Sequence, residues 1–273
     1  MPKLNIVTVC YNDPDFEKTA QSIVNQTFQD FYWVVVDGNS KPDIIQTIKK
    51  YEYRIDKFIS EPDKGLYDAY NKGISYVNEG YIHFLNSGDK YSNNDVLKNI
   101  FENKDYKSDI LYGDINFVKQ NSEITNIKFK DELGKYFFIN ENIATPSTFV
   151  KYDLFKKFGN FSLEYKIVSD LERWIVFHKN NASFEHINIT VADFDTTGIS
   201  SKKENKKLHN CEKKELYKKY YSEKELEEAI KNHKIKLKFF EKIFSVKNLT
   251  NSEYKMVTIL NFHIKIKKKD KKG

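Results

Sequence analysis

The chain has 273 residues, of which 40% are hydrophobic and 31% charged, and its formal net charge is +6. This length and composition allow a sizeable buried core and exclude global disorder, while no apolar run reaches the roughly 18 residues of a membrane-spanning helix. The excess lysines gather at residues 202–219 and from residue 265 onward, so we expect a basic surface at one end of the protein rather than a nucleic-acid-binding body.

The two cysteines, Cys10 and Cys211, stand in unrelated contexts without the spacing of metal ligands. We therefore expect both to be reduced thiols in a cytoplasmic protein. Met1 is followed directly by a strand pattern, and not by a charged and then apolar leader, so we expect no secretory signal.

The first 90 residues alternate between strand and helix patterns. Short apolar, β-branched runs predict strands at 4–10, 31–36, 56–60 and 80–85, and amphipathic stretches predict helices at 13–26, 41–51 and 66–77. Asp13 is suited to cap the first helix and Pro14 to begin it. This order predicts a parallel sheet with helices on both faces and right-handed crossovers.

The regular alternation ends after residue 89. The patterns there predict helices at 95–103, 151–158 and 169–179, strands at 109–118, 123–130 and 184–191, a flexible loop at 198–201, and charged helices at about 203–220 and 222–241. The alternation of apolar and polar residues at 254–268 predicts an exposed strand pair. We divide the chain into segments 1–90, 91–200 and 201–273 on these patterns.

Polar residues follow three of the predicted strands: Tyr11 after the first, Asp37 after the second and Asp89 after the fourth. Ligands of α/β sheets bind at the carboxyl ends of strands, and an acid there can hold a divalent cation against a phosphate. Neither a G-x-G-x-x-G fingerprint nor a P-loop is present, which argues against dinucleotide binding and ATP hydrolysis. These features indicate a nucleotide whose diphosphate is neutralised by a metal ion.

Four segments together resemble the family 2 glycosyltransferases, in particular the bacterial enzymes of colanic-acid, capsule and O-antigen assembly. They are VTVCYN at 7–12, VDGNS at 36–40, EPDKGLYDAYNKG at 61–73 and FLNSGD at 84–89. The resemblance extends over residues 4 to 200, and the block from residue 63 to 73 is its most specific part.

The resemblance implies a GT-A fold: an α/β, Rossmann-like, mostly parallel sheet flanked by helices, here with a helical, basic C-terminal extension. It also implies an inverting transfer from a nucleotide-diphosphate sugar, with a UDP-sugar as the expected donor. The expected acceptor is a saccharide or a lipid-linked oligosaccharide of surface polysaccharide synthesis. Segment 1–90 would bind the donor and segment 91–200 the acceptor. A lipid-linked acceptor would place the protein at the inner face of the cell membrane.

The family's motifs also imply site residues. The positions expected near the nucleotide sugar are Thr8, Tyr11, Asp37, Asp63, Asn71, Lys72 and Ser87, with Asp37 reading the base. Asp89 matches the last acid of the family's D-x-D motif and is the expected ligand of Mn²⁺ or Mg²⁺. Ser87 stands where the first acid is usual, so only one side-chain ligand comes from this motif.

An inverting transfer also needs a base that deprotonates the acceptor hydroxyl. The family places an acid for this role at the start of a helix, where this chain has VSDLE at 168–172. We select Asp170, with Glu172 as the reserve candidate. The nearby segment 143–149 resembles the family's acceptor-side block, but Thr145 and Pro146 replace the usual histidine and glutamine.

Structural interpretations compete with several of these roles. Asp37 could only cap a turn, because Asp-Gly is a common turn pair, and Lys72 could be a solvated helix lysine. His83 lies inside a predicted strand and is expected to be a packed core histidine. Two other functional classes stay open at this point: a degenerate glycosyltransferase that acts as a binding subunit, and a sugar-1-phosphate nucleotidylyltransferase.

The last 40 residues, 234–273, mix lysines with large apolar residues. Such a segment can bury its apolar groups in an interface while its lysines reach the headgroups of anionic lipids. We therefore expect that this end of the chain can make peripheral contact with an anionic membrane. The alternative is that it packs on the catalytic domain or on a second subunit.

Overall fold

The computed structural model describes residues 3–119, 121–196 and 205–232, together with three strands at 244–248, 254–259 and 262–267. The chain divides into two compact units, Met1–Tyr220 and Tyr221–Gly273. The boundary lies at residue 221, whereas the sequence pattern begins the extension at residue 201. The first stretch of the predicted extension therefore belongs to the first unit.

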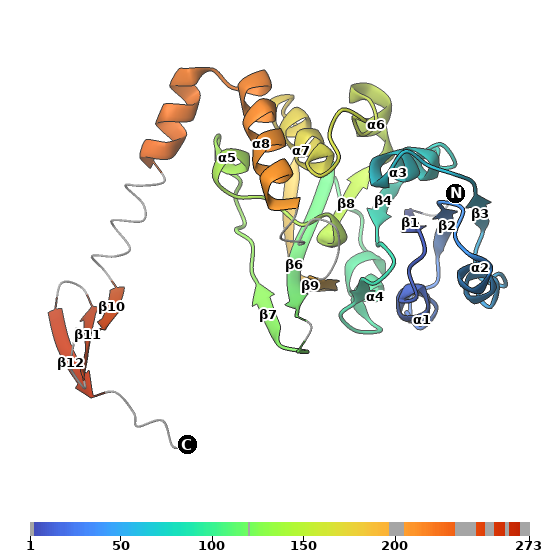
Figure 1. Cartoon of the computed structure of the whole chain (residues 1–273), viewed down its shortest axis with the longest axis horizontal. Helices are drawn as coiled ribbons and strands as arrows, with labels where there is room; N and C mark the ends of the chain where they lie inside the picture. The colour runs from blue at the N-terminus through green and yellow to red at the C-terminus, as the bar shows by residue number, and fades with distance from the viewer. Residues whose placement is uncertain are drawn as a thin grey trace. The chain divides into compact units, whose positions relative to one another are not determined.

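The elements of the first unit follow the predicted order, with several short additions (Figure 1). They are β1 (Leu4–Cys10), α1 (Phe16–Val24), β2 (Phe31–Asp37), α2 (Pro42–Lys49), β3 (Lys57–Ser60), α3 (Leu66–Ile74), β4 (Tyr81–Phe84), β5 (Lys90–Tyr91), α4 (Val96–Phe101), β6 (Ile110–Val118), β7 (Ile124–Ile127), α5 (Phe137–Asn140), the 3₁₀ turn η1 (Thr145–Ser147), β8 (Thr148–Lys151), α6 (Tyr152–Phe158), α7 (Ser169–Lys179), β9 (Phe184–Asp195) and α8 (Lys206–Tyr220).

One nine-stranded sheet organises this unit, in the order β3-β2-β1-β4-β8-β6-β9-β5, with β7 paired to β6. The strands β1 to β4 are parallel to one another, as predicted. Beyond β4 the sheet is mixed, because β8 runs antiparallel to both β4 and β6, and β9 runs parallel to β6. The strands predicted at 109–118 and 123–130 are present as β6 and β7, which pair antiparallel.

Helices cover the parallel half of the sheet on both faces, with α1 and α2 on one side and α3 on the other (Figure 1). Strand β1 alternates accordingly: Leu4 and Ile6 join the core that contains Ile23 of α1. Its next residue, Val7, faces α3, where a Cβ added to Gly73 would lie 2.4 Å from Val7 Cγ1. A glycine is therefore required for the close approach of α3 to the sheet.

The prediction that His83 is a core histidine is confirmed, because its side chain is completely buried in β4. Its Nε2 lies 3.0 Å from the carbonyl oxygen of Pro146, which can only accept, so Nε2 carries the proton. Nδ1 then accepts from the Tyr91 hydroxyl at 2.8 Å. Burial lowers the pKa of His83 to about 4, so the ring is neutral at physiological pH.

Several elements of the first unit have bounds that differ from the sequence prediction, among them β9 and α1. Strand β9 continues to Asp195 and does not end at Val191, since its pairing with β6 extends to Asp195 opposite Val118. The first helix begins at Phe16, three residues after Asp13, although the Asp13 carboxylate accepts the N–H of Asp15. The predicted loop at 198–201 lies outside the described residues.

The second unit contains a helix at 223–232 and an antiparallel sheet of β10 (Phe244–Asn248), β11 (Tyr254–Ile259) and β12 (Phe262–Lys267). The strand pair predicted at 254–268 is thus present and has a third strand. The end of the predicted helix 222–241 falls on residues 233–243, which lie outside the described residues. Across the described ranges, no helix is long and apolar enough to cross a membrane.

We expect Gly73→Ala to destabilise the protein by about 1–3 kcal/mol, the usual cost of overpacking a core. The added methyl group would meet the Val7 side chain, and α3 would have to move away from β1. Urea unfolding measures the change. Gly134→Ala is the matched control, because a Cβ there has no heavy atom within 4 Å. Equal stability of both variants would show that α3 tolerates the displacement.

Candidate active site

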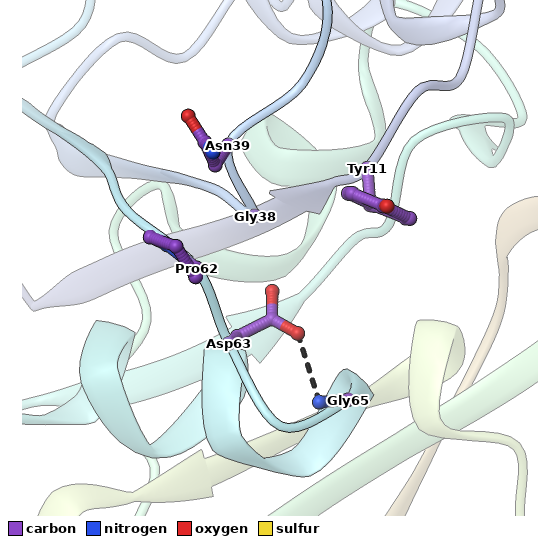
Figure 2. Close-up of a pocket in the computed structure, with 6 residues that line it drawn as sticks. All are labelled: Tyr11, Gly38, Asn39, Pro62, Asp63 and Gly65. Carbon is purple, nitrogen blue, oxygen red and sulfur yellow. Dashed lines mark hydrogen bonds between the residues drawn. The ribbon is translucent and has the colours of Figure 1, made fainter.

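A pocket of about 400 Å³ opens at the carboxyl ends of the first three strands. Its lining consists of Tyr11, Gly38, Asn39, Pro62, Asp63 and Gly65 (Figure 2). These residues come from the loops after β1, β2 and β3 and from the start of α3. The location is the one expected for a ligand of a parallel sheet, and it contains two of the predicted residues, Tyr11 and Asp63.

Asp63 holds its carboxylate at the centre of this pocket wall (Figure 2). One carboxylate oxygen, Oδ1, accepts the N–H of Gly65 at 2.8 Å, which fixes the turn before α3. The other oxygen, Oδ2, lies so close to Gly38 that an added Cβ there would be 2.5 Å away. Any side chain at position 38 would displace Asp63. A glycine after Asp37 therefore allows the loop after β2 to lie close to the loop after β3.

Asp37 is completely buried and does not line the pocket. Its Oδ2 accepts the N–H groups of Asn39 and Ser40 at 3.1 and 3.0 Å and the Ser60 hydroxyl at 2.7 Å. These hydrogen bonds cap the turn after β2, and the contact of Asp37 with a base stays a prediction. Its neighbours Gly38 and Asn39 form the surface that a ligand would meet.

Two further predicted residues also bind protein groups. Thr8 is completely buried, and its hydroxyl accepts the indole N–H of Trp33 at 3.0 Å. The Asn71 amide forms two hydrogen bonds with the backbone of Phe161, at 2.8 and 3.0 Å. Neither side chain lines the pocket, and the expected nucleotide contact of each stays a prediction.

Lys72 contacts the loop that carries Asp63. Its ammonium group donates to the Pro62 carbonyl at 2.7 Å and forms ion pairs with Glu61 at 3.0 Å and Asp68 at 3.8 Å. Its side chain is 20% exposed, so it is not the solvated lysine of the structural interpretation. Lys72 supports the pocket wall and does not line the pocket.

Asp89 follows β4 and is almost completely buried. Its Oδ1 accepts the N–H of Asp195 at 3.0 Å, and Lys18 Nζ lies 3.6 Å from Asp195 Oδ2. Burial raises the pKa of Asp89 to about 8, and the hydrogen bond from Asp195 and the charge of Lys18 only partly oppose this rise. A cation beside Asp89 would offset the cost of burying its negative charge.

The donor set fits a metal ion that is shared with a ligand. No group of three or more His, Cys, Asp or Glu side chains in the described ranges is placed to hold a metal. However, Mg²⁺ and similar cations commonly bind through one or two carboxylates together with substrate phosphates. Asp89 and the adjacent Asp195 supply such hard oxygen donors. Ser87 supplies no acid; its hydroxyl lies beside the Cys10 thiol, whose pKa burial raises to about 11.

Asp170 lies in the first turn of α7, half-buried, with both carboxylate oxygens in contact with hydroxyl groups. Thr145 donates to Oδ2 at 2.8 Å, and the Tyr67 hydroxyl lies 3.0 Å from Oδ1. Burial raises the pKa of Asp170 above its usual range, which these hydrogen bonds only partly oppose. A carboxylate with a raised pKa is a better proton acceptor, as a general base requires.

Glu172, the reserve candidate, has a different environment. Its side chain is 1% exposed, and Oε1 accepts from Lys219 Nζ at 3.1 Å and from the Tyr220 hydroxyl at 2.7 Å. Arg173 forms an ion pair with its Oε2 at 3.2 Å. Glu172 therefore connects α7 to α8 and is not available to an acceptor.

Tyr70 is influenced by both acids of the site, Asp89 and Asp170. Its hydroxyl donates to the Asn86 side chain at 2.8 Å, in the loop that leads to Asp89. Burial raises the pKa of Tyr70, and the charges of Asp170 and Asp89 both raise it further. The two carboxylates thus act on the same buried hydroxyl of α3.

The sequence prediction missed Tyr67 and Asp195, and it did not assign a role to Thr145. Tyr67 lies within the block 61–73 that resembles the family. The resemblance of the block as a whole does not show which of its residues contacts the proposed base. Asp195 could be found only through the extra length of β9.

Residues 5–164, more than half of the chain, match the sequence profile described as glycosyl transferase family 2. The chain belongs to this family. It is 27% identical over 209 residues to the uncharacterized glycosyltransferase Rv1514c of Mycobacterium tuberculosis, a match that covers 74% of this chain and 79% of the relative. It is 25% identical over 206 residues to the PGL/p-HBAD biosynthesis glycosyltransferase Rv2957 of the same species, covering 72% and 76%.

The fold of this glycosyltransferase is shared with solved structures. TarS 1–349 of Staphylococcus aureus, in complex with UDP-GlcNAc, matches with a TM-score of 0.55 at 19% identity, over 71% of this chain and 58% of that chain. The mannosyltransferase PcManGT from Pyrobaculum calidifontis, in complex with GDP-Man and Mn²⁺, matches with a TM-score of 0.54 at 12% identity, over 71% and 56%. The chain thus spans less than two thirds of these proteins. The likeness establishes the GT-A fold.

Proposed function

We propose that this glycosyltransferase moves a sugar from a UDP-sugar to a saccharide or lipid-linked oligosaccharide, with inversion at the anomeric carbon. The observation that carries the proposal is that the carboxylates of Asp89 and Asp170 lie close enough to the buried hydroxyl of Tyr70 for both charges to raise its pKa. The first is suited to the diphosphate side of a donor and the second to the acceptor side. Surface polysaccharide synthesis is the expected setting, as the sequence resemblance implies.

In this mechanism the acceptor hydroxyl attacks the anomeric carbon while Asp170 takes its proton. A new glycosidic bond forms, the bond between the anomeric carbon and the diphosphate oxygen breaks, and its electron pair leaves with the nucleoside diphosphate. Thr145 and Tyr67 hold the Asp170 carboxylate in one orientation, which an in-line attack requires. Burial of Asp170 increases its basicity.

The nucleotide would bind over the pocket formed by Tyr11, Asn39 and Asp63. Tyr11 is 67% exposed, so its ring can contact a base without moving. Asp89 and Asp195 would hold a divalent cation, which when bound neutralises the charge of the leaving diphosphate. The UDP-GlcNAc bound to TarS and the GDP-Man and Mn²⁺ bound to PcManGT support a donor of this class.

We expect Asp170→Asn to lower kcat by about 10²- to 10⁴-fold, the usual contribution of a general base, while donor affinity changes little. Glu172→Gln should mainly lower the melting temperature, because Glu172 contacts α8. In the wild type, kcat/KM should fall as the pH is lowered through the raised pKa of Asp170, since the base must be ionised. Asp153→Asn, an exposed first-turn acid of α6, is the control. A crippled Glu172→Gln beside a nearly normal Asp170→Asn would reverse the assignment.

The donor is tested by measuring hydrolysis and transfer with UDP-, GDP- and dTDP-sugars, with and without Mn²⁺. We expect turnover with a UDP-sugar, and loss of both turnover and Mn²⁺-dependent UDP binding in Asp89→Ala, because that variant lacks the cation ligand. Calorimetry of UDP binding is the direct readout, with the exposed Asp30→Ala as the control. Unchanged Mn²⁺-dependent affinity in a folded Asp89→Ala protein would contradict the metal role.

We also propose that residues 234–273 make peripheral contact with an anionic membrane, which would suit a lipid-linked acceptor. Support comes from the sequence, since lysines near a membrane surface contribute about 1 kcal/mol each. Liposome flotation should show binding to anionic vesicles at low salt that weakens as salt screens the charges. Truncation after Tyr221, the first residue of the second unit, should abolish it. Binding that persists after truncation would exclude this segment as the contact.

A further inference from the structure

Helix α8 contacts the segment that leads into Asp170 through a buried carboxylate. Glu212 is 6% exposed, although it belongs to a helix whose other acids include the exposed Glu215. Its Oε1 accepts the N–H of Lys166 at 2.8 Å, and its Oε2 accepts the N–H of Ile167 at 2.9 Å. One carboxylate thus fixes two consecutive backbone groups that lie only three and four residues before the proposed base.

The contact continues from Ile167 to Asp170 through Tyr67. The Tyr67 hydroxyl oxygen lies 2.7 Å from the Ile167 carbonyl oxygen and 3.0 Å from Asp170 Oδ1, so its single proton is shared between these two acceptors. Both polar groups of the Ile167 backbone are therefore held, the N–H by α8 and the carbonyl by α3. A shift of the 166–167 backbone would move the partner that orients Tyr67, and with it the hydroxyl beside Asp170.

A second buried carboxylate attaches α8 on the other side of Asp170. Glu172, two residues later in the chain, accepts from Lys219 and Tyr220 at the end of α8. The two attachments lie on either side of Asp170 in sequence, and both are made by acids that are almost completely buried. Charge-assisted hydrogen bonds of this kind are the strong ones, and they leave little freedom to the segment between them.

We propose that Glu212 is a positioning residue for Asp170: through the backbone of Lys166 and Ile167 and the hydroxyl of Tyr67, helix α8 sets the orientation of the catalytic base. The proposal rests on the proposed function of Asp170. It makes α8 part of the catalytic apparatus, although the family profile ends at residue 164, well before this helix.

The groups that face the Asp170 carboxylate decide how its pKa responds. The Tyr67 hydroxyl comes from α3 and the Thr145 hydroxyl from the turn η1, and the charge of Asp170 also raises the pKa of Tyr70 in α3. Burial is the main cause of the raised pKa, and the hydrogen bond from Tyr67 opposes it. Loosening of the 166–167 backbone would admit water and lower the pKa, whereas removal of the Tyr67 hydroxyl alone would raise it.

The test compares Glu212→Gln with the exposed control Glu215→Gln in the full-length protein, with UDP-sugar as the probe. Glu212→Gln should lower kcat by about 10- to 100-fold, because small displacements of a catalytic group cost this much, and should leave the donor KM within about threefold. The acidic limb of its pH–rate profile should move to lower pH. Glu215→Gln should match the wild type in all three measurements.

Tyr67→Phe is the second variant, and it decides the case in which Glu212→Gln does not fold. It should also lower kcat, but its acidic limb should move to higher pH. A folded Glu212→Gln protein with a lower melting temperature and unchanged kcat and pH profile would overturn the proposal, and so would an unchanged profile of Tyr67→Phe. If Asp170→Asn itself retains full activity, the proposed base has failed. If only Glu212→Gln and Tyr67→Phe are normal, the base stands and the positioning role has failed.

Discussion

The close packing of α3 against β1 is the constraint on which the rest of the site depends. It exists because residue 73 has no side chain, so that the helix approaches Val7 within the distance of a single methyl group. From this position α3 reaches the proposed base through Tyr67 and the backbone of Phe161 through Asn71. The loop directly before it, with Asp63 and Gly65, lines the pocket. The block at residues 61–73 thus makes contacts both at the pocket and at the proposed base.

Strand β9, toward the opposite edge of the sheet from β3, contributes the residue that contacts Asp89. Strand β9 pairs with β6 as far as Asp195, and this extra length carries a backbone N–H to Asp89, more than a hundred residues away in sequence. Asp195, an acid from another strand, thus lies next to Asp89, whereas position 87 holds a serine. Lys18 of α1 partly balances the resulting negative charge.

The sequence was sufficient for the parallel half of the fold and for the edge of the sheet where the pocket lies. Buried strands and amphipathic helices alternate there, and each has a strong local pattern. The direction in which single side chains point was less predictable. Strands that are covered on both faces show no polar–apolar alternation, so nothing local distinguishes the inward hydroxyl of Thr8 from a ligand contact.

Long-range hydrogen bonds account for most of the other differences. Asp37 and Lys72 lie in the matched motifs, but their polar atoms are used by Ser60, Pro62 and Glu61 in neighbouring loops. The reserve acid Glu172 is likewise used by α8. Such partners follow from tertiary structure alone. The choice of Asp170 over Glu172 came from the resemblance and from helix position, and the contacts of the two acids agree with it.

The two thiols differ in exposure, so that only one of them is accessible to a labelling reagent. Cys10 is buried, and its raised pKa keeps it in the unreactive thiol form at neutral pH. Cys211 is exposed on α8, directly before Glu212. A maleimide dye or spin label would therefore attach at one place without any engineered cysteine. Cys211 directly precedes Glu212, which binds the backbone of residues 166 and 167. A label on Cys211 would therefore report movement of α8 relative to that backbone.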